Sequence, residues 1–164
     1  MSPQSAILRA IEPDAPRRRT FCGYCGHRPP EDTEPESRVC GDCGLGLLLT
    51  ADEGITPKRS DPFVVVDAGL TIRALSQAAE ELFEIAETDV VDQPLENVLV
   101  AAEASDEARG KLNRVMSGAA REPLSARDPD VLVVRPARAF GVRYRARIGR
   151  CEPGRSALLV LAKL

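Results

Sequence analysis

Four cysteines near the N-terminus constrain this 164-residue chain more than any other feature of its sequence. They form two Cys-x-x-Cys pairs, Cys22 with Cys25 and Cys40 with Cys43, separated by fourteen residues. Two intervening residues let a tight turn present both sulfurs of a pair to one metal ion. Because cysteine fills all four positions, the pattern predicts one structural zinc ion per chain rather than a catalytic metal with an open position.

Both pairs share the frame Cys-Gly-x-Cys-Gly, and glycine permits the positive φ that such a turn can require. The paired frame resembles the knuckles of the zinc-ribbon family, with a spacer one residue shorter than the commonest range. Two alternatives remain open: a pair of disulfides, which needs an oxidising compartment, and a redox-active Cys-x-x-Cys, which usually occurs singly. We interpret His27, the only histidine, as a surface or supporting residue.

The composition, with 43% hydrophobic and 29% charged residues, is typical of a soluble globular protein. A net charge of −3 gives no general attraction to nucleic acid or to a membrane surface. No apolar run approaches the roughly 20 residues that span a bilayer, and the N-terminus does not resemble a secretory signal. We therefore expect a cytoplasmic protein with reduced thiols and no membrane partner.

The chain divides into four segments by composition. Residues 1–20 predict a flexible arm with one helical turn at Ala6–Ile11, ending in the basic trio Arg17–Arg19. Residues 21–50 form the four-cysteine zinc ribbon, with a short strand at Leu45–Leu49. Residues 51–60, broken by glycine and proline, predict a linker, and residues 61–164 have the length of one ordinary domain.

The periodicity of residues 61–164 predicts two strands, three helical segments and three further strands. Ser76 and Ser105 are suitable N-caps for the two longer helices, and Gly118 is the expected end of the second. Short helical turns are expected between Thr88 and Val100. The predicted strands are Phe63–Val66, Leu70–Ala74, Val131–Arg135, Phe140–Gly149 and Ala157–Lys163, with a turn at Glu152–Gly154.

This order of elements resembles the PAS domain family. The residues that carry the resemblance are Pro62–Asp67, Leu70–Ile72 and Ser76–Phe83, with Ser76 near the usual asparagine and Glu84 near the usual glycine. The resemblance covers residues 61–164 and implies an α+β fold: a five-stranded antiparallel sheet with helices on one face. It also implies room for a ligand between sheet and helices, and a role in sensing or dimerisation.

The same residues argue against the cofactor chemistry of some PAS domains. Haem-binding members generally use an axial histidine, and residues 61–164 contain none. Photoactive flavin members use a cysteine in a helix motif, whereas Cys151 lies at a predicted strand end. The sequence contains no glycine-rich phosphate loop and no nucleophile elbow, so we expect a protein without catalytic residues.

Six arginines and no acidic residue lie between Arg135 and Arg150. Arg143, Arg145 and Arg147 alternate with apolar residues, which predicts a strand with one basic and one apolar face. The basic face is either solvated and paired with acids elsewhere, or a docking stripe for an acidic partner. The apolar face would point inward, where Tyr144 could line a small-molecule cavity.

Three functions fit these observations. The first is a signalling or regulatory protein that binds a small molecule, a protein partner or a second copy of itself. The second is a nucleic-acid-binding transcription regulator that uses Arg17–Arg19 and the zinc ribbon, although residues 20–60 carry only four basic residues against seven acidic ones. The third is a redox switch in which thiolate oxidation releases zinc.

Overall fold

A computed structural model describes residues 17–123 and 128–164 of the chain. Most of the predicted arm, including the helical turn expected at Ala6–Ile11, lies outside the described residues. None of the helices in the described ranges is both long and apolar enough to cross a membrane.

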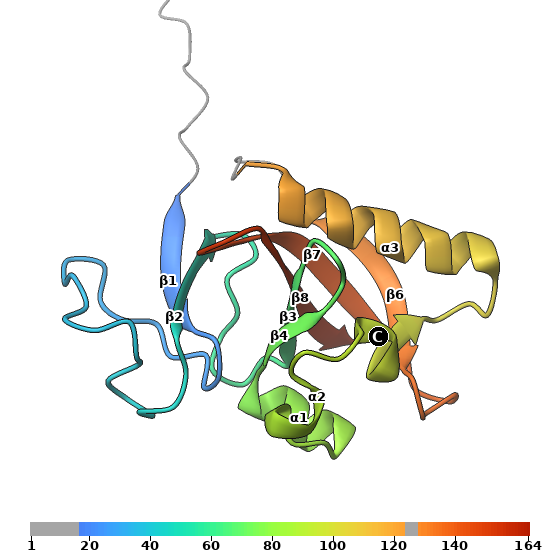
Figure 1. Ribbon diagram of the computed structural model, residues 1–164, viewed down its shortest axis with the longest axis horizontal. Helices are drawn as coiled ribbons and strands as arrows, with labels where there is room; N and C mark the ends of the chain where they lie inside the picture. Colours follow the sequence, from blue (N-terminus) through green and yellow to red (C-terminus); the bar gives the residue numbers. More distant parts are fainter. Residues whose placement is uncertain (1–16, 124–127) are drawn as a thin grey trace, which may run out of the picture.

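The elements after residue 60 follow the order expected from the sequence, with one short strand added between the helices (Figure 1). The predicted strand from Phe140 instead starts at Tyr144, because the chain turns through residues 137–143 and leaves Phe140 exposed. The elements are β3 (Phe63–Asp67), β4 (Ile72–Leu75), α1 (Gln77–Phe83), α2 (Glu87–Val90), η1 (Leu95–Asn97), β5 (Leu99–Ala101), α3 (Asp106–Arg121), β6 (Asp130–Pro136), β7 (Tyr144–Glu152) and β8 (Ser156–Lys163).

The strands form one antiparallel sheet that is larger than the predicted five-stranded one. Strands β4, β3, β8, β7 and β6 are neighbours in that order, and β5 pairs with the outer edge of β6. Two N-terminal strands, β1 (Arg18–Cys22) and β2 (Leu48–Asp52), continue the sheet. Strand β2 can join the sheet because two strands pair with the same edge of β7. Strand β6 pairs with Tyr144–Ile148 of that edge, and β2 pairs with Cys151 and Glu152.

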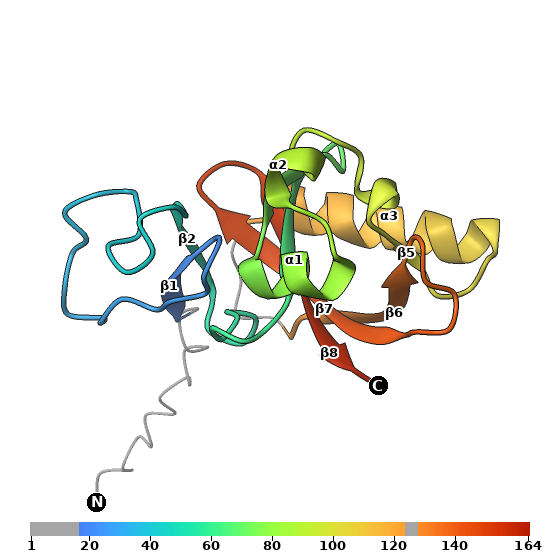
Figure 2. The same ribbon diagram turned by 90° about the horizontal axis from the view of Figure 1, so that it is seen from below.

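The helices and the inner face of the sheet enclose the main hydrophobic core. Val64 and Val66 of β3 pack there with Tyr144, Ala146 and Ile148 of β7, and with buried residues of all the helices. Helix α3 lies across β7 and β8. In Figure 2 the N-terminal module, which consists of β1, β2 and the loop between them, lies to the left of the helices. The expected arrangement of an antiparallel sheet with helices on one face is therefore confirmed for this part of the chain.

A second core covers part of the opposite, outer face of the sheet. Phe63 and Val65 of β3 and Leu158 and Val160 of β8 are buried there. Their partners come from the N-terminal module and the segment that follows it: Phe21, Ala51 and Ile55. The rings of Phe21 and Phe63 meet edge to face, with centroids 5.6 Å apart, a favourable aromatic geometry. The module is therefore packed onto the sheet.

Residues 45–60 differ from their predicted structure. The strand expected at Leu45–Leu49 runs instead from Leu48 to Asp52, because the backbone of Leu45 and Gly46 is engaged by the second cysteine knuckle. The segment 51–60, predicted to be a linker, begins inside β2 and buries Ile55 and Thr56. Gly149 of β7 makes room for this packing, since a Cβ there would lie 2.9 Å from the Ile55 side chain.

Both predicted N-caps are confirmed. The Ser76 hydroxyl accepts a hydrogen bond from Ala79 N, and the Ser105 hydroxyl accepts one from Ala108 N. Helix α3 does not end at Gly118 but continues to Arg121. The reason is Arg150, whose Nη1 donates to the carbonyl oxygens of Ala120 and Glu122 and so satisfies acceptors that a helix end leaves unpaired.

Candidate functional site

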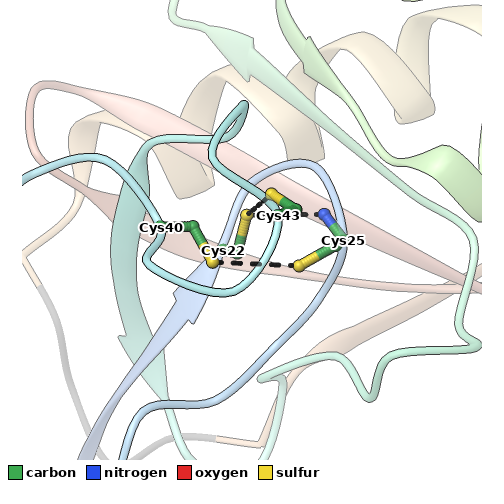
Figure 3. A group of neighbouring side chains, drawn as sticks. All are labelled: Cys22, Cys25, Cys40 and Cys43. Carbon is green, nitrogen blue, oxygen red and sulfur yellow. Dashed lines mark hydrogen bonds between the residues drawn. The ribbon is translucent and has the colours of Figure 1, made fainter.

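The four cysteines predicted as metal ligands converge on one point (Figure 3). All four sulfurs lie within 4.8 Å of one another, with Cys22 Sγ 3.7 Å from Cys43 Sγ and Cys25 Sγ 3.9 Å from Cys40 Sγ. A tetrahedron with zinc–sulfur bonds of about 2.3 Å separates its sulfurs by about 3.8 Å. A disulfide would instead need a sulfur–sulfur distance of about 2.05 Å. The four residues could therefore hold a metal ion.

The two knuckles that carry the sulfurs share one backbone design. Gly26 and Gly44 follow the second cysteine of each pair with φ of 71° and 69°. Each donates its N–H to the carbonyl of the first cysteine of its pair, at 3.1 Å to Cys22 O and 2.9 Å to Cys40 O. Positive φ strains residues that carry a Cβ, which explains why both pairs are followed by glycine.

Backbone N–H groups also point at two of the sulfurs. Tyr24 N and Cys25 N lie 3.4 Å from Cys22 Sγ, and Gly46 N lies 3.4 Å from Cys43 Sγ. Burial raises the pKa of the Cys22 thiol to about 12 in spite of these N–H groups. Burial also opposes ionisation of Cys43, but the N–H groups of Gly46 and Leu45 and the neighbouring thiols outweigh it and lower the pKa to about 7. Such N–H groups orient and stabilise metal-bound thiolates.

Gly46 closes the site from one side and was not recognised from the sequence. A Cβ on this residue would lie 2.3 Å from Cys22 Sγ and 2.8 Å from the Tyr24 Cβ. No side chain therefore fits at position 46 without moving a sulfur. The sequence places Gly46 outside both Cys-Gly-x-Cys-Gly frames, so only the folded arrangement reveals the requirement.

The first knuckle is hydrogen-bonded to helix α1 of the neighbouring fold. Tyr24, which lies between Cys22 and Cys25, accepts a hydrogen bond at its carbonyl oxygen from Gln77 N, at the start of α1, at 2.8 Å. The Tyr24 hydroxyl donates to Glu80 Oε2, also at 2.8 Å, which raises the pKa of Tyr24 to about 12. The four-cysteine cluster is thus attached directly to α1.

Arg28 of the module and Arg59 of the segment before β3 form hydrogen bonds that join these two parts of the chain. Arg28 donates to the carbonyl oxygens of Thr56 and Pro57. Arg59 Nη2 lies 2.6 Å from Asp42 Oδ2, within the second knuckle, and 3.1 Å from His27 Nδ1. His27 therefore contacts an arginine and is not part of the sulfur cluster.

The arginines expected to contact other molecules differ in their surroundings. Arg18 pairs with Glu152, and Arg19 pairs with Glu31 and Glu53. Arg147 Nη1 donates to Gly54 O at 2.8 Å, so this member of the predicted docking stripe is used within the chain. Arg143, which precedes β7, and Arg145, which lies within it, are both exposed, as expected for the basic stripe.

A groove of about 310 Å³ lies between the η1–β5 segment and the N-terminal half of α3. Its floor includes the buried residues Leu95, Leu99 and Leu112, and Arg109, Asn113 and Arg135 line it as well. Tyr144, suggested as a cavity residue, is buried in the main core and is not among the residues lining this groove. No local sequence pattern identifies the groove, because its residues come from four separate elements.

Comparison with known proteins identifies the family. A sequence profile of the family described as the PAS fold matches residues 57–149, which is more than half of the chain. The chain therefore belongs to the PAS fold family. The comparison with curated proteins found no match.

Several solved PAS domains are similar in structure. The RpfR quorum-sensing receptor PAS domain of Cronobacter turicensis, in complex with BDSF, has a TM-score of 0.50 at 14% identity and covers 67% of this chain and 99% of its own. The PAS domain of nitrogen regulation protein NR(II) from Vibrio parahaemolyticus has a TM-score of 0.43 at 23% identity, covering 64% and 90%. The PAS domain of an HTR-like protein from Haloarcula marismortui has a TM-score of 0.46 at 14% identity, covering 63% and 81%. At these identities the similarity describes the fold alone.

Proposed function

We propose that this protein is a cytoplasmic sensory or regulatory PAS protein in which a structural zinc ion fixes the N-terminal module to the sheet. The observation that carries the sensory part is the groove of about 310 Å³ between η1–β5 and α3, a volume in the range of small-molecule sites. The sulfur geometry supports the zinc part.

Zinc is the metal that best suits the cluster. Four thiolates in tetrahedral arrangement are typical of structural zinc, and iron–sulfur clusters are the other common occupant of such a donor set. Three of the four cysteines are buried and only Cys43 is partly exposed, which supports a closed structural site. The ion would hold both knuckles together and so keep Tyr24 against α1.

The groove favours a ligand with an apolar body and a polar head. Leucines supply its apolar surface, while its charged lining combines the donors Arg109 and Arg135 with the acceptors Glu96 and Glu103. A PAS domain of similar fold, that of RpfR, is known in complex with BDSF, which supports ligand binding as a use of this fold. We propose binding without catalysis, and a response transmitted through association with another protein.

Ion pairing weighs against the nucleic-acid alternative. Arg18 forms an ion pair with Glu152, and Arg19 forms ion pairs with Glu31 and Glu53. To bind nucleic acid, both arginines would have to break these ion pairs and pair with phosphates instead. Phosphate affinity depends on cations that release counterions on binding. Measurable binding of duplex DNA at low salt that is lost on substitution of these arginines would favour the alternative.

Native mass spectrometry beside a denatured control tests the ligand proposal. We expect a small-molecule adduct, either as purified or after incubation with a small-molecule cell extract. The substitution Asn113→Trp should fill the groove and abolish the adduct. Arg114→Trp, at the exposed neighbouring position outside the groove lining, should retain it. An adduct that survives Asn113→Trp, or no adduct under either condition, would contradict a ligand site here.

A further inference from the structure

The outer face of the sheet is only half covered. On β8 and β3 it is buried under the N-terminal module, as Val160 and Phe63 show. The same face continues across β7 to β6, where Val131 and Val133 point outward and are 53% and 43% exposed. The register makes the two halves continuous, since Val160 lies beside Arg147 and Arg147 beside Val131.

Arg147 marks the border between the covered and the open half. Its hydrogen bond to Gly54 O fixes its guanidinium to the segment that follows β2. Beyond this border, Val133 lies directly opposite Arg145, which in turn lies beside the exposed Ala162 of β8. Arg143 precedes β7 on the same side of this border. We name Val131, Val133, Arg143 and Arg145 the β6–β7 patch.

The charges of the patch are not neutralised by ion pairs within the described residues, although Glu103 and Glu107 line a hollow together with Val131, Val133 and Arg143. Between Val131 and Cys151 lie six of the 22 basic residues and none of the 25 acidic residues of the whole sequence. Across residues 17–123 and 128–164, neither Arg143 nor Arg145 forms an ion pair or a side-chain hydrogen bond, whereas the arginines at the other end of the sheet are paired. A basic area on a chain of net charge −3 attracts acidic partners selectively.

We propose that the β6–β7 patch binds an acidic peptide segment of a protein partner. Aliphatic side chains of that segment would cover Val131 and Val133, and its carboxylates would pair with Arg143 and Arg145. Apolar contact surrounded by charge pairing is the usual composition of a protein interface. This proposal goes beyond the sensory function and depends on neither the metal nor the groove.

The charge of the patch favours an acidic peptide over two other partners, a second copy of this chain and nucleic acid. A symmetric pair of chains centred on the patch would place each arginine near its own copy, and like charges across an interface are unfavourable. Nucleic acid would gain only the unpaired arginines as phosphate contacts and would meet exposed valines between them. An acidic segment with aliphatic residues satisfies both parts of the patch.

Selection from a displayed random-peptide library tests the proposal with the full-length protein. We expect the enriched peptides to contain acidic and aliphatic residues together. Their affinity, measured by fluorescence anisotropy, should fall by about tenfold in Arg143→Glu/Arg145→Glu, because two exposed ion pairs are lost and the new charges repel. Val133→Thr, which is isosteric and exposed, should weaken binding without affecting the fold. The control Arg38→Glu/Arg155→Glu makes the same change in net charge at two other exposed sites and should bind normally.

Other results would overturn the proposal. These are no enrichment, enriched peptides without acidic residues, or binding that is equal in wild type and in Arg143→Glu/Arg145→Glu. Duplex DNA that binds wild type and loses affinity in that variant would assign the patch to nucleic acid instead. Thermal unfolding of each variant checks that the fold is intact. Zinc content and ligand adducts are measured separately, so failure here leaves the sensory function standing.

Discussion

The hydroxyl of Tyr24 donates a hydrogen bond to Glu80 Oε2 at 2.8 Å, which joins the first cysteine knuckle to helix α1. The other oxygen of the same carboxylate, Glu80 Oε1, accepts a hydrogen bond from Glu87 N at the start of α2. One side chain therefore connects the four-cysteine module with two helices of the PAS fold. The module and the PAS domain consequently should lose structure together.

Substitution of the Tyr24–Glu80 pair tests this connection. Tyr24→Phe removes only the hydroxyl, and we expect it to lower the free energy of unfolding by about 1 kcal/mol, since a partly exposed hydrogen bond to a carboxylate contributes modestly. A double-mutant cycle with Glu80→Ala, followed by denaturant unfolding, isolates the coupling between the two residues. Glu81→Ala, at an exposed position on the same helix, is the matched control and should show no coupling with Tyr24→Phe.

The glycine that closes the metal site provides a second prediction. Gly46→Ala should lower zinc affinity sharply, because its Cβ would lie 2.3 Å from Cys22 Sγ. Gly41→Ala is the control, since a Cβ at that position meets nothing within 4 Å. Competition with a colorimetric zinc chelator measures both. Equal zinc retention in the two variants would show that the sulfurs are not held in the arrangement described.

The two helix caps should differ in their contribution to stability. Ser76 is buried, and its hydroxyl accepts hydrogen bonds from both Ala79 N and Phe63 N. Ser76→Ala therefore removes an N-cap and also leaves a buried strand N–H unpaired, so we expect a loss of about 2 kcal/mol or more. Ser105→Ala removes only an exposed cap and should cost about 1 kcal/mol. Urea unfolding of both variants measures the two losses. A larger loss in Ser105→Ala than in Ser76→Ala would contradict this prediction.

Acid should destabilise the fold partly through Asp67. Burial alone would raise the pKa of this carboxyl, but hydrogen bonds from Thr71 N and from Arg73, among others, outweigh it and lower the pKa below its ordinary value. A carboxyl with a lowered pKa in the folded state stabilises the fold above its unfolded pKa, and this stabilisation is lost as the pH falls through the folded pKa. Thermal unfolding between neutral pH and pH values below about 4 should therefore show a smaller decrease for Asp67→Asn than for wild type. Equal slopes would contradict the role of Asp67.

The sequence was most informative where a pattern was local. The cysteine spacing identified four residues that do converge, and the unbroken apolar run Phe63–Val66 indicated a strand buried on both faces. Both serine caps followed from the same short-range rules. These features depend on a few consecutive residues, so a single sequence contains the information.

Long-range packing was not predictable in the same way. The residues 51–60 contain glycine and proline and suggested a linker, yet Ile55 is buried against β7 where Gly149 leaves room. The connection between Tyr24 and Glu80 spans 56 residues of sequence, and the groove draws on four elements. Such contacts depend on how elements that are distant in the sequence pack together, which no local pattern specifies.

Hydrogen exchange before and after zinc removal tests the central claim, that the four-cysteine module is an integral part of the PAS sheet. Mass spectrometry measures amide hydrogen exchange in the protein loaded with zinc and in the same protein after treatment with a chelator. We predict that metal removal speeds exchange in β1 and β2 and also in α1, β3 and β8, because Phe21, Ala51 and Tyr24 contact those elements. Faster exchange confined to residues 17–50, with unchanged α1, β3 and β8, would show an independent module and contradict the account.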